Sequence, residues 1–233
     1  MVKKMLPMVL AMAFSLNAVA DEAEIKKMME AKLGTKVEGV TKAGYLGLYE
    51  VFADGNIVYT DEKGTAIFVG PLVDGKTMKN VTEERMKKLT AIKFSELPLD
   101  RAIKQVRGDG KRVMATFEDP NCGYCKRFEA DLQKINNVTI HMFLYPILGK
   151  DSTEKSRNIW CAKDRSKAWA DWMLRDTSPA TASCDAAALA RNVEFGKKHK
   201  ITGTPTLIFA DGSRVPGAIG APQIEKFLAE AKP

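Results

Sequence analysis

The sequence predicts a protein of mixed α+β and α/β class, with a small N-terminal part and a larger part in which helices cover a mixed sheet. A hairpin signal marks the first part, where the apolar runs Tyr45–Phe52 and Ile57–Tyr59 flank a turn at Asp54-Gly55. In the second part a strand-like apolar run, Val113–Phe117, passes within a few residues into a helix-like run, Lys126–Asn137. Strand and helix signals then alternate to the C-terminus, which is typical of a sheet packed against helices.

Residues 1–20 have the pattern of a secretory signal peptide. Lys3 and Lys4 precede an apolar stretch, Met5–Leu16, and the small residues Ala18–Ala20 form a cleavage site. The apolar stretch is too short for an ordinary membrane span, and no later segment approaches the roughly 18 apolar residues that a span requires. We therefore expect an exported protein without stable membrane insertion.

The charge of the chain is positive but scattered. The net charge is +7 at pH 7, and lysines occur in isolated pairs such as Lys87-Lys88 and Lys197-Lys198, among acidic residues. No groove-reading motif accompanies this charge, so nucleic acid is not an expected partner. Four cysteines in an exported chain suggest two disulfide bridges, because disulfides persist outside the cytosol.

Residues 21–79 are expected to form a small domain. A helix over Asp21–Leu33 precedes the hairpin, and Thr65–Val69 adds a third strand. About 60 residues of this kind bury only a marginal core, and strand edges remain free to pair. This organisation favours self-association.

Residues 80–97 are expected to form a linker helix between the two domains. Asn80 or Thr82 can cap its N-terminus, and Pro98 interrupts it. The apolar residues that follow have helical spacing, which predicts another helix before the turn at Arg107–Gly110. These residues are Leu99, Ala102, Ile103 and Val106.

The motif Cys122-Gly123-Tyr124-Cys125 lies where the strand-like run gives way to a helix. The first N–H groups of a helix have no internal partner, and the helix dipole favours negative charge beside them. A cysteine there is favoured as the thiolate, with a pKa lowered from about 8.5 to between roughly 3.5 and 7.5. We expect Cys122 to be the nucleophile, and Cys125, about one turn later, to be the resolving thiol of a redox pair.

Other uses of the motif fit the sequence less well. A zinc site requires four ligands, but Cys161 and Cys184 are far apart in sequence, and the two histidines, His141 and His199, show no paired spacing. Haem attachment requires histidine where Lys126 stands. An inert structural disulfide remains a minor alternative. We expect neither a metal nor another cofactor.

Cys161 lies in a segment of helical character, Asp151–Arg175, which follows a buried strand at Val138–Tyr145. Cys184 lies in a loop-like segment before another expected helix, at about Ala186–Lys198. A bridge between them would close a loop of about 23 residues and contribute about 3 kcal/mol on the chain-entropy model. A structural staple is the leading interpretation, and a second redox centre is the alternative. The chain then ends with a strand, a turn, a second strand and a helix, at Thr206–Phe209, Arg214–Gly217 and Ala221–Ala231.

Four motifs closely resemble the DsbC family of bacterial periplasmic disulfide isomerases, in the family's order and across essentially the whole mature chain. They are Phe117–Lys126, Ile159–Asp164, Ser183–Asp185 and Gly203–Thr206. The resemblance implies a cystatin-like N-terminal dimerisation domain, a linker helix, and a thioredoxin-fold domain over residues 98–233 with a helical insert at about 151–200. It also implies a V-shaped homodimer whose cleft binds misfolded chains, and a structural disulfide between Cys161 and Cys184.

The resemblance assigns further site residues. It implies a cis peptide bond at Pro205, packed against the cysteine motif, and a backbone at Thr204 that pairs with an extended substrate peptide. Gly123 and Tyr124 are expected to belong to the same substrate-binding surface. The chain departs from the thioredoxin pattern where a buried acid precedes the first cysteine by six residues, because Thr116 stands there. Glu118 is then the candidate for passing protons to Cys125.

The predicted function is that of a periplasmic disulfide isomerase that reshuffles or reduces wrong disulfides in misfolded exported proteins, with chaperone-like client binding. An oxidising periplasm requires an electron donor, which the resemblance implies to be the membrane reductase DsbD. Two alternatives stay open. One is a reductase or oxidase of narrow client range, as in the related DsbG branch, and the other is a peptide-binding chaperone with structural cysteines.

Overall fold

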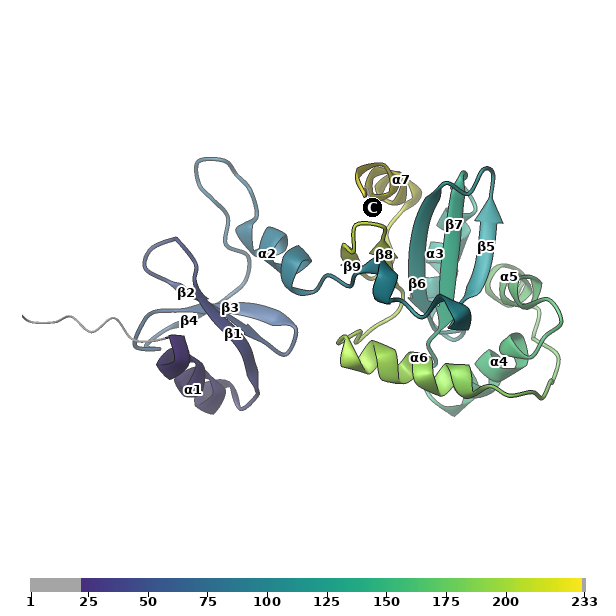
Figure 1. Cartoon of the computed structure of the whole chain (residues 1–233), viewed down its shortest axis with the longest axis horizontal. Coiled ribbons are helices and arrows are strands. Elements are labelled where there is room, and N and C mark those ends of the chain that lie inside the picture. The colour runs from purple at the N-terminus through teal and green to yellow at the C-terminus, as the bar shows by residue number, and fades with distance from the viewer. Residues whose placement is uncertain (1–21, 232–233) are drawn as a thin grey trace, which may run out of the picture. The chain divides into compact units, whose positions relative to one another are not determined.

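The computed structural model describes residues 22–231, which form two compact units, with the division along the chain between Gly70 and Pro71 (Figure 1). The predicted signal peptide, residues 1–20, lies outside the described residues. No helix within residues 22–231 is both long and apolar enough to cross a membrane.

The smaller unit is one antiparallel sheet with a helix on one face. The hairpin turn predicted from the sequence is present, and Asp54 and Gly55 have φ values of 50° and 76° there, as the two central residues of a tight hairpin require. Ile25 and Met29 of the helix pack against apolar residues of the sheet. The elements are α1 (Glu22–Leu33), β1 (Val37–Lys42), β2 (Tyr49–Ala53), β3 (Asn56–Thr60) and β4 (Ile67–Val69), with the strands in that spatial order. Strand β1 was not predicted.

The helix α2 (Val81–Leu89) is shorter than the predicted linker helix over residues 80–97. Asn80 caps it as expected, by accepting a hydrogen bond from the backbone N–H of Glu83. The helix ends at Thr90, whose N–H and hydroxyl both donate hydrogen bonds to the carbonyl of Met86. Residues 90–102 then contain two short 3-10 turns, Phe94–Glu96 and Leu99–Arg101.

The larger unit is built on a five-stranded sheet in the order β5-β7-β6-β8-β9. The central pair, β6 and β7, is parallel, and the other neighbours are antiparallel. The helix predicted around Ile103 and Val106 is wrong, since these residues belong to β5, which pairs along its length with β7. The strands are β5 (Ile103–Arg107), β6 (Arg112–Glu118), β7 (Val138–Leu144), β8 (Thr206–Phe209) and β9 (Arg214–Pro216).

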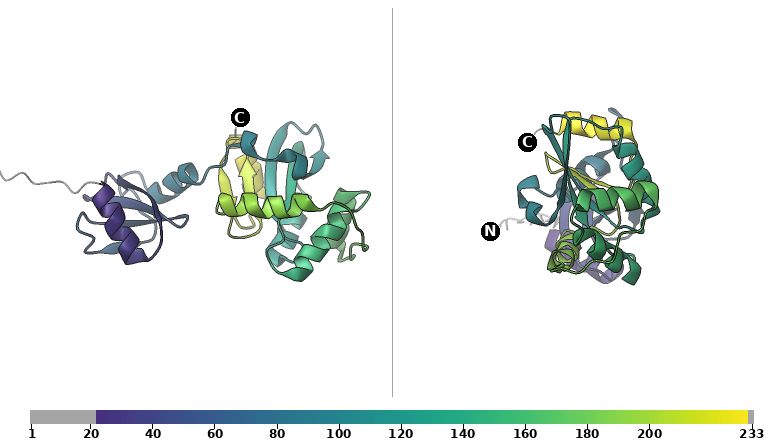
Figure 2. Two further views of the ribbon diagram at one scale, coloured as in Figure 1. Left: turned by 60° about the horizontal axis from the view of Figure 1, so that its bottom comes forward. Right: turned by 90° about the vertical axis from the view of Figure 1, so that its right-hand side faces the viewer.

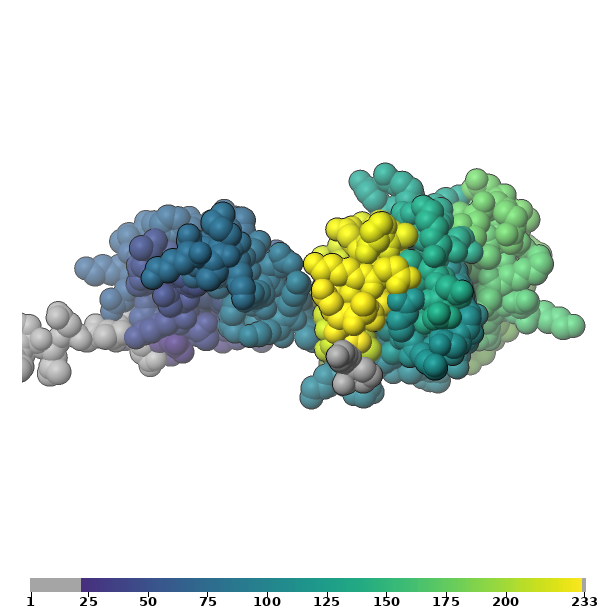
Figure 3. Space-filling view, turned by 90° about the horizontal axis from the view of Figure 1, so that it is seen from above, coloured from purple at the N-terminus to yellow at the C-terminus, as the bar shows by residue number. Residues whose placement is uncertain are grey.

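Helices cover both faces of this sheet (Figures 1 and 2). On one face, α3 (Gly123–Leu132) and α7 (Ala221–Glu230) pack with Met114 of β6, and Figure 3 shows α7 in yellow beside the teal surface of the sheet and α3 region. On the other face, α6 (Ala187–Lys198) packs against Phe117 of β6. Alternate residues of β6 therefore face opposite layers, and the residues that share a face with Met114 lie under α3.

A helical insert separates β7 from β8, as the sequence predicted. It consists of α4 (Lys150–Trp160) and α5 (Arg165–Arg175), followed by α6. Trp169 and Met173 of α5 are buried in the same cluster as Cys122 and Cys125. The insert thus supplies part of the wall around the cysteine motif.

Candidate functional site

The strand β6 delivers the cysteine motif to the first turn of α3. Cys122 is the N-cap of this helix, with φ −81° and ψ 113°, and its Sγ accepts a hydrogen bond from the backbone N–H of Cys125 at 3.3 Å. Cys125 is completely buried, and 6% of the Cys122 surface is exposed. The helix start therefore supplies a backbone N–H to the Cys122 sulfur, and this residue keeps a small exposed fraction.

A second loop, far along the chain, closes over Cys122. The peptide bond between Thr204 and Pro205 is cis, and the Sγ atom of Cys122 lies 3.2 Å from the carbonyl oxygen of Thr204. The carbonyl of Pro205 accepts a hydrogen bond from the N–H of Gly217 at 2.7 Å, which ties this loop to the segment after β9. The fold thus brings together Cys122, Cys125 and the Thr204-Pro205 pair.

The remaining residues of the motif form the rim of the site. Tyr124 has 61% of its surface exposed, and the guanidinium of Arg127 lies 4.4 Å from the centre of its ring. A Cβ atom added at Gly123 would meet no other atom within 4 Å. The surface next to Cys122 is therefore open and presents an aromatic ring.

The two thiols differ strongly in acidity. Hydrogen bonds lower the pKa of Cys122 to about 5, chiefly one from the Cys125 thiol, with others from Thr204 and from the backbone N–H groups of Cys125 and Tyr124. Burial is the main cause that raises the pKa of Cys125 far above its ordinary value, and the sulfur of Cys122 and the carboxyl of Glu118 raise it further. Near neutral pH the site thus holds one thiolate and one thiol.

Asp119 organises the loop that leads into the motif. This residue is completely buried, and its carboxylate accepts hydrogen bonds from the Asn121 N–H and the Ser152 hydroxyl at 2.8 and 2.7 Å. It also accepts the N–H groups of Ile147 and Leu148 at 2.8 and 2.9 Å. One carboxylate therefore joins the cysteine loop to the start of the helical insert.

Replacing this carboxylate should destabilise the protein. The variant Asp119→Ala leaves three backbone N–H groups and a hydroxyl without their acceptor, so we expect a loss of at least about 3 kcal/mol in the free energy of unfolding. Urea unfolding of the protein with Cys122 and Cys125 reduced measures this change in the free energy of unfolding. Asp211→Ala is the matched control, since exposed Asp211 accepts one bond, from the N–H of Ser213, and should cost less than about 1 kcal/mol. Equal losses in the two variants would contradict this role of Asp119.

Two buried acids lie below the cysteines. Glu118, the last residue of β6, is completely buried, and no hydrogen-bond donor reaches either of its carboxyl oxygens. Glu129 of α3 is 2% exposed and accepts a hydrogen bond from Trp169 Nε1 at 2.7 Å. Glu118 was a candidate from the sequence, but Glu129 was not, because an acid on a helix is usually solvated.

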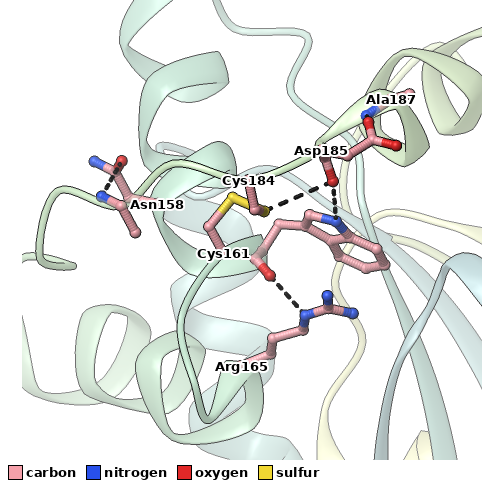
Figure 4. Close-up of a disulfide and its surroundings, with 8 residues drawn as sticks. Asn158, Cys161, Arg165, Cys184, Asp185 and Ala187 are labelled. Carbon is pink, nitrogen blue, oxygen red and sulfur yellow. Dashed lines mark hydrogen bonds between the residues drawn. A yellow bond between two sulfur atoms is a disulfide. The ribbon is translucent and has the colours of Figure 1, made fainter.

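The other two cysteines form a disulfide in the helical insert (Figure 4), with an S–S distance of 2.01 Å. Cys161 follows α4, and Cys184 precedes α6. The bridge is flanked by hydrogen bonds from Trp160 Nε1 to the carbonyl of Asp185 and from Arg165 Nε to the carbonyl of Trp160. The bridge thus joins the end of α4 covalently to the segment before α6 and closes the loop that contains α5.

Removing this bridge should weaken the insert. Because the cysteines are separated by 23 residues, we expect Cys161→Ala combined with Cys184→Ala to lower the free energy of unfolding by about 3 kcal/mol. Urea unfolding without reductant measures the change. Cys122→Ala combined with Cys125→Ala is the control for loss of two thiols. An unchanged transition in the Cys161 and Cys184 double variant would contradict the stabilising role.

In the part of the chain that the structure describes, no group of three or more His, Cys, Asp and Glu side chains is placed to hold a metal ion. His141 lies in β7, where its ring packs edge-on against Phe94.

Two protein families match separate parts of the chain. The thioredoxin-like domain family matches residues 99–232, and the family described as the disulfide bond isomerase protein N-terminal domain matches residues 16–83. A thioredoxin-like domain with this N-terminal domain defines the chain as a thiol:disulfide oxidoreductase.

Individual similar proteins identify the family to which the chain belongs within the thiol:disulfide oxidoreductases. The chain is 49% identical over 195 residues to the probable thiol:disulfide interchange protein DsbC of Bordetella parapertussis. The aligned residues make up 84% of this chain and 69% of that protein. It is 32% identical over 225 residues to the thiol:disulfide interchange protein DsbC of Escherichia coli, covering 94% and 92%. A solved structure of a disulfide interchange protein from Neisseria gonorrhoeae shares 40% identity at a TM-score of 0.55, over 58% of this chain and 98% of that one. The chain belongs to the DsbC family.

Proposed function

We propose that this protein is a periplasmic disulfide isomerase whose nucleophile is Cys122. The observation that carries the proposal is the contrast between two neighbouring thiols, a Cys122 sulfur with a pKa of about 5 and a Cys125 thiol that keeps its proton. A thiolate that exists at neutral pH can attack a disulfide, and a protonated partner does not compete for it.

The proposed cycle begins with attack of the Cys122 thiolate on one sulfur of a wrong disulfide in a client protein. A bond forms between Cys122 and the client, and the other client sulfur leaves as a thiolate. If that thiolate or another client thiol attacks elsewhere and finally releases Cys122, the client is isomerised. If Cys125 attacks the sulfur of Cys122 instead, the client leaves reduced and the protein is oxidised to the Cys122–Cys125 disulfide.

The loop at Thr204-Pro205 is proposed to hold the client beside Cys122. An extended client peptide can pair with the backbone of Thr204, as in recognition by strand addition. Gly123 presents no side chain to obstruct it, and the exposed ring of Tyr124 offers an apolar contact. Such contacts are independent of sequence, which suits clients that share only a wrong disulfide.

Isomerisation requires Cys122 to start each cycle reduced, which an oxidising periplasm opposes. We therefore propose that a membrane reductase of the DsbD type supplies electrons to the Cys122–Cys125 disulfide. The predicted signal peptide, residues 1–20, is proposed to direct export to this compartment.

The smaller unit is proposed to join two copies of the chain. Its edge strand β4 presents three consecutive apolar residues to solvent, Ile67, Phe68 and Val69, with exposed fractions of 39, 53 and 83%. A free apolar edge of this kind is suited to pairing with another strand. A dimer would also place two client-binding sites in one molecule, which supports chaperone-like holding.

A charge on this edge should separate the copies. We expect Phe68→Lys to convert the protein from dimer to monomer in sedimentation velocity, because a lysine here disfavours strand pairing. Leu46→Lys is the matched control, since Leu46 is 95% exposed in the loop before β2 and should leave the dimer intact. A Phe68→Lys protein that remained dimeric would place the interface elsewhere.

Recovery of a multi-disulfide enzyme from its scrambled, oxidised form tests the function. We expect the reduced protein to restore client activity in catalytic amounts, and Cys125→Ala to accumulate client bound through Cys122. A protein that reduced the scrambled client without restoring its activity would be a reductase instead. A protein that prevented client aggregation but never formed a mixed disulfide would be a chaperone.

A further inference from the structure

A short connection, residues 119–122, joins β6 to α3 and determines where the Cys122 sulfur stands. The Cys122 N–H donates a hydrogen bond to the carbonyl of Asp119 at 3.1 Å, which closes a turn. The two residues inside this turn, Pro120 and Asn121, belong to no helix or strand. Contacts from neighbouring elements therefore decide how precisely the turn is held.

Trp172 of α5 holds the first of these two residues. Its Nε1–H donates a hydrogen bond to the carbonyl of Pro120 at 2.6 Å. The ammonium groups of Lys126 and Lys155 lie 4.4 and 4.6 Å from the centre of the indole ring. A cation over an indole face is attracted by the ring, so both lysines help to keep the indole in place.

Asn121 is held from α4. Its side-chain N–H groups donate hydrogen bonds to the Asp151 carboxylate at 2.6 Å and to the Ser152 hydroxyl at 3.0 Å. Its side-chain carbonyl accepts a hydrogen bond from the ammonium of Lys155 at 3.1 Å. Lys155 therefore contacts both Asn121 and the ring of Trp172, and the two helices of the insert hold adjacent residues of the turn.

The two ammonium groups do not act chiefly as charges on the Cys122 sulfur. Lys126 is paired with the carboxylate of Asp176. Lys155 is paired in the same way with Asp151, and such pairing cancels much of the field of each cation at a distance. The main causes that lower the pKa of Cys122 are hydrogen bonds. The lysines thus act on the indole and the turn.

We propose that Trp172 is a positioning residue for the nucleophile, because it fixes the turn that keeps the Cys122 sulfur at the N-terminus of α3. The sulfur accepts the N–H of Cys125 at 3.3 Å while the Cys122 backbone has its N-cap geometry. If Pro120 and Asn121 can move, the sulfur spends part of its time away from the helix N–H groups. The thiolate is then less stabilised.

This role connects the reactivity of Cys122 to the helical insert. The helix α5 lies in the loop that the Cys161–Cys184 bridge closes. Trp172 also packs against the apolar cluster that contains Cys122 and Cys125. The insert therefore contributes to the chemistry of a cysteine that lies outside it.

The variant Trp172→Phe tests the inference, since phenylalanine keeps a ring for the two lysines but has no N–H for the carbonyl of Pro120. We expect the pKa of Cys122 to rise from about 5 to about 5.7. Thiolate absorbance of the reduced protein, with the oxidised protein as blank at each pH, measures this pKa. At about pH 7 the same rise should shift the equilibrium with glutathione about fivefold towards the Cys122–Cys125 disulfide. Asn121→Ala should shift both quantities in the same direction.

Trp160→Phe is the matched control. Trp160 also donates its indole N–H to a backbone carbonyl, that of Asp185 at 3.3 Å, and the guanidinium of Arg165 lies 3.7 Å from the centre of its ring. This variant loses the same kind of hydrogen bond from the same insert, so urea unfolding should show a similar loss of stability in the two tryptophan variants. The pKa of Cys122 and the glutathione equilibrium should stay native in Trp160→Phe.

The inference rests on the proposed role of Cys122 as the nucleophile, and the experiment separates the two. Native values of both quantities in Trp172→Phe would overturn the positioning role and leave the isomerase proposal intact. Equal shifts in Trp172→Phe and Trp160→Phe would also overturn it, because a general loosening of the insert would then be the cause. A native protein whose Cys122 titrated only near the ordinary thiol pKa of about 8.5 would instead refute the proposed nucleophile.

Discussion

Replacing Cys122 with serine is expected to reduce isomerisation of a scrambled client to the uncatalysed rate. A hydroxyl cannot form a disulfide, and the helix start that ionises a thiol cannot ionise an alcohol near neutral pH. Recovery of client activity over time, at equal concentrations of native and Cys122→Ser protein, measures the loss.

Cys125→Ser is the informative control for this experiment. This variant keeps the Cys122 nucleophile, so it should still form mixed disulfides. It should lose mainly the step in which Cys125 attacks Cys122 and releases a reduced client. Substantial isomerisation by Cys122→Ser would move the nucleophile elsewhere in the chain and contradict the proposed mechanism.

The Cys122 sulfur is expected to be ionised over almost the entire physiological pH range. With a pKa of about 5, Cys122 should be half ionised near pH 5. At about pH 6 roughly nine-tenths should be thiolate, some hundreds of times the fraction of an ordinary thiol with a pKa of about 8.5. The ultraviolet absorbance of the thiolate in the native protein, with Cys122 and Cys125 reduced, should show this transition, because Cys125 keeps its proton over the same pH range and the other two cysteines form a disulfide.

The same ionisation makes the stability of the reduced protein depend on pH. The folded-state pKa of Cys122 is lowered relative to the unfolded chain, so its contribution is complete above the unfolded value and is lost as the pH falls through about 5. The reduced protein should thus gain stability relative to Cys122→Ala as the pH rises from about 5 to 8.5. A thiolate absorbance of Cys122 that appeared only near the ordinary thiol pKa of about 8.5 would contradict an ionised nucleophile at neutral pH.

Local chemistry made much of the site predictable from sequence. The turn residues Asp54 and Gly55 predicted the hairpin of the smaller unit. The change from an apolar run to a helical pattern predicted that Cys122 lies at a helix start. The extent to which Cys122 is covered was not predictable, because the residue that closes over it, Thr204, is 82 positions away. Only the resemblance to the DsbC family predicted that Thr204 lies beside Cys122.

The errors have physical causes as well. Ile103 and Val106 are compatible with a helix by spacing, but pairing with β7 gives every residue of this short segment a strand partner. Tertiary pairing therefore overrode a local pattern. Glu129 was missed for a similar reason, since an acid on a helix is usually solvated, and only the packing of Trp169 from the insert reveals that this one is buried.

The tryptophans of the insert have a practical consequence. Trp169 donates to Glu129, and Trp172 donates to the carbonyl of Pro120 at 2.6 Å, one residue before Asn121 and two before Cys122. The ammonium groups of Lys126 and Lys155 both lie over the ring of Trp172, at 4.4 and 4.6 Å. Indole emission responds to charge and hydrogen bonding in its immediate surroundings. We therefore expect the intrinsic fluorescence of the protein to differ between the reduced and the oxidised form of the Cys122–Cys125 pair, so that the redox reaction can be followed without an added label.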